Sequence, residues 1–184
     1  MPDTQETMIA MPEPAPPPEL VRVQAPSPIG TLAIELTGRT LTRVVLAPPG
    51  GERKHFQPFA TMDDSELLDE ILGRFSEYFA GARRNLELDY DLGPSGVTGF
   101  SRRVLRETAR VPYGKTRTYQ QIAEAAGNPD GYRMVLSTLL VNPLPIVIPC
   151  HRVVTSKSGV GSYIAGTKRK KWLLRLEREG LQLI

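Results

Sequence analysis

The stretch "NPLPIVIPCHRVV", residues 142–154, contains the only cysteine of the 184-residue chain. The apolar run before Cys150 has the composition of a buried strand, where a lone cysteine is usually a small inert hydrophobic side chain. Three neighbours favour a reactive thiol instead. His151 is a base, the charge of Arg152 favours a thiolate, and Pro149 ends regular strand pairing, which would place the sulfur at the mouth of a cleft.

The position of the histidine sets a geometric condition. Adjacent residues of an extended strand point to opposite faces, so His151 serves Cys150 only if the chain turns there or if a water molecule relays the proton. The other histidine, His55, lies in a Pro/Gly-rich loop of the acidic half, which disfavours a cysteine protease. One cysteine and two distant histidines form no metal-ligand spacing, so no metal is expected.

Charge divides the chain into two halves. Residues 1–98 carry 8 basic and 15 acidic side chains, a net charge of −7, whereas residues 99–184 carry 15 and 5, a net charge of +10. A half this basic indicates a polyanionic partner, most often nucleic acid, although basic side chains also solvate ordinary surfaces. No apolar run approaches the roughly 18 residues of a membrane span, and the start of the chain lacks a signal-peptide pattern. We therefore expect a cytoplasmic protein with no membrane partner and no internal disulfide.

The pattern of apolar residues predicts an α/β N-terminal domain, a small sheet plus a helix, followed by a mostly α C-terminal domain with a helix-turn-helix. Residues 1–19 are proline-rich and predict a disordered tail. Residues 20–92 predict a scaffold domain without visible chemistry. Its expected elements are strands in residues 20–26, 31–36, 41–47 and 86–93, and a helix capped by Asp63 or Asp64 and closed by Gly81.

Residues 93–98 predict a linker, and residues 99–184 predict the helical domain. Thr98 and Thr118 are suited to cap the helices that follow them, and Gly127 is suited to end the second one. A further helix is expected in residues 132–141. Two short helices joined by a tight turn are typical of a helix-turn-helix, although many helical hairpins bind nothing. Their place in the basic half favours DNA binding.

Three segments together resemble one family. "NPLPIVIPCHRVV" lies between "TYQQIAEAAGNPDGYR", residues 118–133, and "KKWLLRLEREG", residues 170–180. This combination resembles the O6-alkylguanine-DNA alkyltransferases, the methylated-DNA–protein-cysteine methyltransferases, over about residues 98–180; the N-terminal part is similar only in its coarse pattern. The resemblance implies irreversible, single-turnover repair of O6-alkylguanine, and also of O4-alkylthymine, in flipped-out duplex DNA, without a cofactor. It also implies a monomer that is nucleoid-associated when bound to double-stranded DNA containing alkylated guanine.

The resemblance assigns four catalytic positions. Cys150 corresponds to the acceptor thiol, and His151 to a base that acts through water. Glu177 corresponds to a glutamate that orients the histidine, and Asn142 to an asparagine that braces the turn beside the cysteine. Ordinary roles remain open for two of them, because Glu177 could belong to a solvated helix end and Asn142 could simply stop a helix.

The remaining assigned positions face the substrate or the DNA. Tyr119 corresponds to a tyrosine that hydrogen-bonds the flipped base, and Arg133 to an arginine that fills the gap the base leaves. Tyr163 is expected to stack in the loop that closes over the base, and Arg152 to contribute positive charge toward the DNA. As alternatives, Tyr119 could only pack its helix and Arg133 could be one more phosphate contact.

Two segments depart from the family pattern. Tyr132, Met134 and Leu136 stand where the family has small residues around the arginine, which indicates a more distant approach to DNA or apolar wedging. Ile164 and Ala165 replace a serine and a glycine in the closing loop and should reshape the substrate pocket. Two other functions therefore stay open: a relative that binds alkylated DNA without repairing it, and a helix-turn-helix regulator with a structural thiol.

Overall fold

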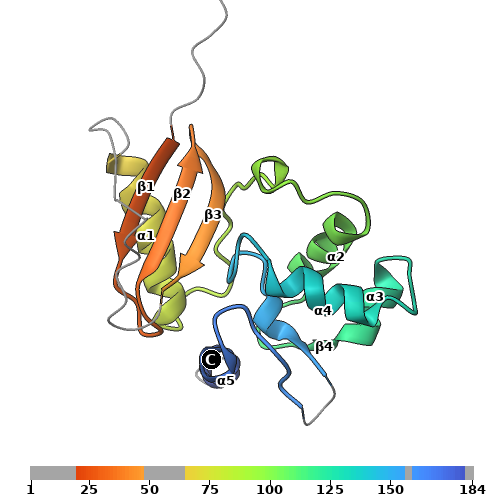
Figure 1. The fold of residues 1–184 in the computed structure, drawn as a ribbon. Helices are drawn as coiled ribbons and strands as arrows, with labels where there is room; N and C mark the ends of the chain where they lie inside the picture. Colours follow the sequence, from red (N-terminus) through yellow and green to blue (C-terminus); the bar gives the residue numbers. More distant parts are fainter. Residues whose placement is uncertain (1–19, 48–64, 156–158, 181–184) are drawn as a thin grey trace, which may run out of the picture.

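The computed structural model describes residues 20–47, 65–155 and 159–180. A small antiparallel sheet with one helix is followed by a mostly helical part (Figure 1), which confirms the fold class predicted from the sequence. The proline-rich tail, the loop that contains His55 and the predicted caps Asp63 and Asp64 lie outside the described residues.

The sheet has the order β1-β2-β3, formed by Leu20–Ala25, Leu32–Thr37 and Thr40–Leu46. Helix α1, Ser65–Phe79, packs beside it (Figure 1), and its apolar stripe joins the core. Two glycines take left-handed conformations at chain reversals, and Gly81 closes α1 as the sequence predicted. Gly38 turns the β2–β3 hairpin with φ of 56°, and Gly81 follows α1 with φ of 76°.

The prediction of a strand in residues 86–93 is wrong. Only an isolated bridge joins Tyr90 to Leu41, with the Leu41 amide donating to Asp89 and the Asp91 amide donating to the Leu41 carbonyl. Glu87 has φ of 52°, a left-handed conformation that interrupts an extended run. The alternating sequence therefore packs against the edge of the sheet without forming a fourth strand.

The helical part forms the expected helix-turn-helix from α3 and α4. Thr118 caps α3 as predicted: its hydroxyl accepts from the Gln121 amide at 3.1 Å, and the Gln121 side chain accepts from the Thr118 amide at 2.8 Å. Thr98 precedes α2 without a side-chain capping bond. The elements are the 3₁₀ turn η2 (Gly93–Ser95), α2 (Gly99–Ala109), β4 (Arg117–Thr118), α3 (Tyr119–Ala125), α4 (Tyr132–Leu140), the 3₁₀ turn η3 (Cys150–Arg152), β5 (Val153–Val154) and α5 (Thr167–Gly180).

The sheet and the helices share one continuous hydrophobic cluster, which extends from Val21 in β1 to Leu173 in α5. The Val44 amide of β3 donates to the Pro143 carbonyl at 2.8 Å, which ties the sheet to the segment before the cysteine. The candidate site therefore lies where the two halves of the chain meet. Within the described ranges, no helix is long and apolar enough to cross a membrane.

Candidate active site

The segment before the cysteine is a compact loop, so the buried strand suggested by its composition is wrong. Residues 142–149 contain three prolines, which cannot donate to a β-ladder, and only an isolated bridge joins Pro145 to Ile148. Cys150 then begins the 3₁₀ turn η3. The chain thus turns at the cysteine, which is one of the two conditions that the sequence set for a partnership with His151.

Asn142 braces this loop from inside and is only 1% exposed. Its amide nitrogen donates to the Ile148 carbonyl at 2.9 Å and to the Cys150 sulfur at 3.1 Å. Its side-chain oxygen accepts from the Leu144 amide at 3.0 Å. One buried side chain therefore both holds the loop closed and fixes the position of the sulfur.

The thiol of Cys150 is neutral at rest. Burial raises its pKa to about 11, although the hydrogen bond from Asn142 and the charge of Lys170 act in the opposite direction. The sequence suggested that Arg152 favours a thiolate, but the charge of Arg152 is directed to Glu177 instead. A thiolate at this position therefore requires a base to remove the proton.

His151 is suited to remove that proton. Its Nε2 lies 2.9 Å from Glu177 Oε1, and both side chains are fully buried. A carboxylate at Nε2 holds the imidazole proton there and leaves Nδ1 as the acceptor. Among the described residues Nδ1 has no hydrogen-bond partner. Burial lowers the pKa of His151, with Arg152 and Lys170 acting in the same direction and Glu177 opposing them, which favours the neutral base.

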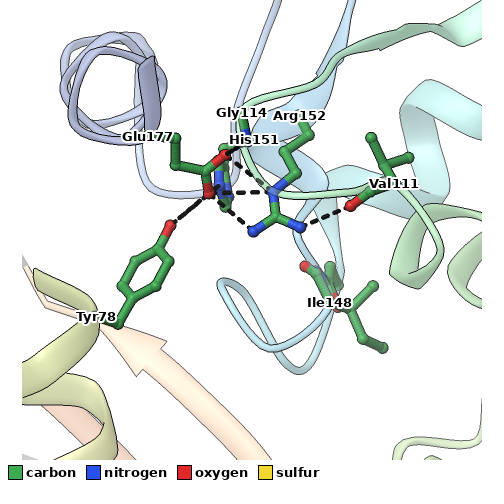
Figure 2. A network of polar contacts seen from close by, with 8 residues as sticks. Tyr78, Val111, Gly114, Ile148, His151, Arg152 and Glu177 are labelled. Atoms are coloured by element: carbon green, nitrogen blue, oxygen red, sulfur yellow. Dashed lines mark hydrogen bonds and ion pairs between the residues drawn. The ribbon is translucent and has the colours of Figure 1, made fainter. Parts of the chain in front are cut away.

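Glu177 is the centre of the buried network in Figure 2. Arg152 Nη2 donates to its Oε1 at 2.9 Å, and the Gly114 amide donates to its Oε2 at 2.9 Å. Burial alone would raise the pKa of Glu177, but His151 and Arg152 outweigh burial and lower it to about 2. Glu177 is thus an ionised carboxylate inside the protein rather than part of a solvated helix end.

Arg152 belongs to this interior network. Its Nη1 donates to the Val111 carbonyl at 2.6 Å, and the residue is 5% exposed. A guanidinium committed to Glu177 and to a carbonyl is not presented to a phosphate. The predicted DNA-facing role of Arg152 therefore does not fit its position, and the structure supports a role in holding Glu177.

Sequence reasoning missed two polar side chains of the site, Tyr78 and Lys170. The Tyr78 hydroxyl reaches Glu177 Oε1 from α1 at 2.7 Å. Lys170 is fully buried, and its Nζ donates to the carbonyls of Val153 and Ser162 at 2.5 and 3.0 Å. Burial lowers the pKa of Lys170 to about 8, while Cys150 opposes this shift. In the sequence, Tyr78 looks like part of an apolar helical stripe, and Lys170 looks like part of a basic run on the surface.

Two residues predicted to recognise a base, Tyr119 and Tyr163, lie at the 159–165 loop. Tyr119 opens α3, and its hydroxyl donates to the Ser162 carbonyl at 3.2 Å. A Cβ at Gly161 would lie 2.9 Å from that hydroxyl, so only glycine allows the 159–165 loop to pack this closely. Tyr163 is buried, with its ring edge-on to His151 at 6.3 Å between centroids.

Arg133 lies apart from the buried group, exposed on α4. Its guanidinium lies 5.7 Å from the ring centroid of Tyr132, and its Nε donates to the Tyr132 hydroxyl at 3.1 Å. Tyr132 and Met134 are 45% and 51% exposed. The arginine is therefore free to project from the helix-turn-helix, with an aromatic ring beneath it.

Ile164 and Ala165 line a cleft of about 500 Å³ between the sheet and the loop before the cysteine. Asn142 and Pro145 line the same cleft, whereas Cys150, His151 and Tyr163 do not. Ile164 and Ala165 thus line a cleft next to the buried group, and Asn142 belongs to both. In the part of the chain that is described, no group of three His, Cys, Asp or Glu side chains could hold a metal ion.

The fold and the site together define a helix-turn-helix protein that carries one buried thiol beside a histidine–glutamate pair. A family model described as "6-O-methylguanine DNA methyltransferase, DNA binding domain" matches residues 99–179. A methylated-DNA–protein-cysteine methyltransferase of Methanosarcina barkeri is 32% identical over 156 residues, which cover 85% of this chain and 96% of that protein. The protein of the same name from Mycobacterium tuberculosis is 33% identical over 154 residues, which cover 83% and 88%. The chain therefore belongs to the methylated-DNA–protein-cysteine methyltransferase family.

The solved structures agree with this assignment. The crystal structure of Mycobacterium tuberculosis OGT in complex with DNA is 31% identical, with a TM-score of 0.74, and the match covers 86% of this chain and 93% of that chain. A structure of the Mycobacterium tuberculosis O6-methylguanine methyltransferase gives the same TM-score of 0.74 at 30% identity, covering 90% and 99%. Both halves of the fold, and not only the helix-turn-helix, are therefore shared.

Proposed function

We propose that this protein repairs DNA by transferring an alkyl group from O6 of guanine in duplex DNA to the sulfur of Cys150, once per molecule. The observation that carries the proposal is the buried Cys150, held by Asn142 and followed by a histidine whose Nε2 is committed to Glu177 while Nδ1 is uncommitted. The names of the relatives and the DNA complex of a similar protein support the same substrate.

The proposed steps are as follows. The damaged nucleotide leaves the stack, because O6 is unreachable inside the duplex, and Arg133 projects from α4 into the gap. A relaying water passes the thiol proton to His151 Nδ1. The thiolate attacks the alkyl carbon, so that a C–S bond forms as the C–O6 bond breaks and the electron pair stays on guanine. A hydrogen bond from the Tyr119 hydroxyl stabilises the charge that develops on the base.

The product explains why no turnover is expected. A thioether offers no easy leaving group, so Cys150 stays alkylated and the guanine takes up one proton in place of the alkyl group. The burial that raises the pKa of the resting thiol also keeps it from unselective reactions before a substrate arrives. Each molecule would therefore repair one base, without a cofactor.

The finer substrate range is part of the proposal. O4-alkylthymine presents a similar exocyclic oxygen and is proposed as a second substrate. Ile164 and Ala165 add carbon to the wall of the cleft, so small alkyl groups should transfer faster than bulky ones. We also propose that the protein acts as a monomer in which residues 20–92 support the helix-turn-helix and acceptor domain of residues 99–184.

The decisive experiment is to incubate the full-length protein with duplex DNA containing O6-methylguanine and to weigh the intact protein. One added methyl mass on the peptide containing Cys150, with a burst equal to the protein concentration, is the expected result. Repeated turnover would contradict the single-use mechanism. Tight binding of alkylated DNA without a mass change would favour the non-repairing binder, and sequence-specific binding of unmodified DNA would favour a regulator.

A further inference from the structure

A tyrosine from the N-terminal half enters the buried polar group. Tyr78 belongs to α1, yet its hydroxyl points at Glu177, which lies in α5 at the other end of the chain (Figure 2). The residue is 1% exposed. Its ring is held edge-on by Phe79 and Tyr113, with centroids 5.6 and 6.1 Å away. Packing therefore fixes the hydroxyl in one place.

The hydroxyl shares one carboxylate oxygen with the catalytic histidine. Tyr78 Oη lies 2.7 Å from Glu177 Oε1, His151 Nε2 lies 2.9 Å from the same oxygen, and the longer distance from Tyr78 Oη to His151 Nε2 is 3.4 Å. Burial and the charge of Glu177 raise the pKa of Tyr78 well above 10, so the phenol keeps its proton. Since Glu177 is ionised, Tyr78 is a permanent donor to the oxygen that orients His151.

We infer that Tyr78 is a positioning residue of the reaction, which keeps His151 in the neutral form that accepts a proton at Nδ1. The inference rests on the proposed alkyl transfer. A carboxylate that receives a hydrogen bond from Tyr78 carries less uncompensated charge, so it stabilises an imidazolium less strongly. Without that bond, Glu177 would stabilise the doubly protonated His151 up to a higher pH. Nδ1 would then carry a proton and could not accept another.

The other charged or titratable groups around His151 come from several elements and stay in place when only the Tyr78 hydroxyl is removed. Glu177 and Lys170 approach from α5, Arg152 and Cys150 from η3, and Tyr163 from the closing loop. Tyr113 packs against Tyr78 and has no hydrogen-bond partner among the described residues. Tyr113 is therefore a control with the same ring chemistry, which is also buried, at 7% exposure against 1% for Tyr78.

The test measures single-turnover methyl transfer from an O6-methylguanine duplex to full-length protein, from about pH 5.5 to 8.5, the range in which histidine titrates. In Tyr78→Phe, the acid limb of the rate profile should shift to higher pH by roughly half a pH unit. At the alkaline end, the transfer rates should approach those of wild type. The final burst should equal that of wild type. Tyr113→Phe should leave the limb unmoved.

A second variant tests the opposite direction without removing the hydroxyl. With 3-fluorotyrosine at position 78 the phenol is a stronger donor, so the acid limb should move to lower pH. Equal slowing at every pH, or an equal shift in Tyr113→Phe, would overturn the inference while leaving the transfer itself intact. If wild type transfers no methyl group, the proposed function fails, and a ¹⁵N titration of His151 in wild type and Tyr78→Phe then decides the role of Tyr78. An unchanged titration would reject it.

Discussion

The buried group at Cys150 and the outer surface of α4 differ in almost every physical respect. Cys150, Asn142, His151 and Glu177 are at most 2% exposed, and polar contacts pair Asn142 with Cys150 and His151 with Glu177. On α4 and just beyond it, large apolar side chains face the solvent. They are Tyr132 at 45%, Met134 at 51%, Leu140 at 40% and Val141 at 69% exposure.

This contrast shows which part of the protein the chemistry constrains. The proposed proton relay would fail if one donor or distance changed, and the buried group has the residues that the family resemblance implies. A surface that meets DNA needs only shape, charge and one projecting arginine, so large side chains can replace small ones. Apolar side chains suit the minor groove, where wedges between base steps are common. Tyr132, which lies against Arg133, could broaden the wedge that we propose for the arginine.

The largest effect should come from Cys150→Ser, which should abolish transfer. A hydroxyl is far less acidic than a thiol of pKa about 8.5 and forms almost no anion for attack. The variant should still bind alkylated duplex DNA, because α3, α4 and the cleft are untouched. Intact mass measures the loss of transfer, and a gel-shift assay on the same sample measures the retained DNA binding. Residual transfer in Cys150→Ser would mean that the acceptor is another side chain.

Glu177→Gln should cause the next largest loss, in stability as well as rate. It leaves Arg152 buried without its counter-charge, which should lower the free energy of unfolding by about 3 to 5 kcal/mol in urea denaturation. Transfer should slow, yet the burst should reach the same final size, because Glu177 orients the base and accepts no alkyl group. A smaller burst in folded protein would contradict this division of roles.

The pH dependence of stability provides the control for Glu177. Its pKa is lowered from 4.5 to about 2 in the folded protein, so its contribution is complete above 4.5 and is lost as the pH falls toward 2. The stability difference between wild type and Glu177→Gln should therefore narrow across that window. A difference that stays constant to the acid end would mean that the ionised carboxylate is not what stabilises the site.

Much of the fold and of the buried group could be predicted from the sequence, and what could not be predicted has a physical reason. The fold class, the Thr118 cap and the cysteine motif follow from local patterns, which act over a few residues. Tyr78 and Arg152 were misread because their roles depend on what lies opposite them in the folded protein. A tyrosine on an apolar stripe looks like core until a distant carboxylate receives its hydroxyl. An arginine beside the cysteine looks DNA-facing until Glu177 is seen to neutralise it.

On the exposed surface, Arg133→Ala should slow transfer from duplex DNA by about 10- to 100-fold. Extruding a base costs a few kcal/mol, and the missing side chain leaves part of that cost uncompensated. Transfer from a free alkylated base such as O6-benzylguanine should be nearly unchanged, since nothing has to be flipped. Single-turnover rates with the two substrates make the comparison, and equal slowing of both would reject the wedge role.

Tyr132→Ala should have the smallest effect and should distinguish the apolar part of this surface from its charge. Losing the ring beside Arg133 removes an exposed cation–π contact of about 0.5–1 kcal/mol, which should weaken duplex binding by about two- to fivefold. The salt dependence should not change, because no charge is lost, whereas Arg133→Ala should reduce the slope by about one. Binding titrations at several salt concentrations measure both quantities, and Tyr132→Phe should retain most of the affinity. If Tyr132→Ala instead tightened binding, the large side chain would be keeping α4 away from the groove, and the apolar surface would be an obstacle to DNA rather than a contact.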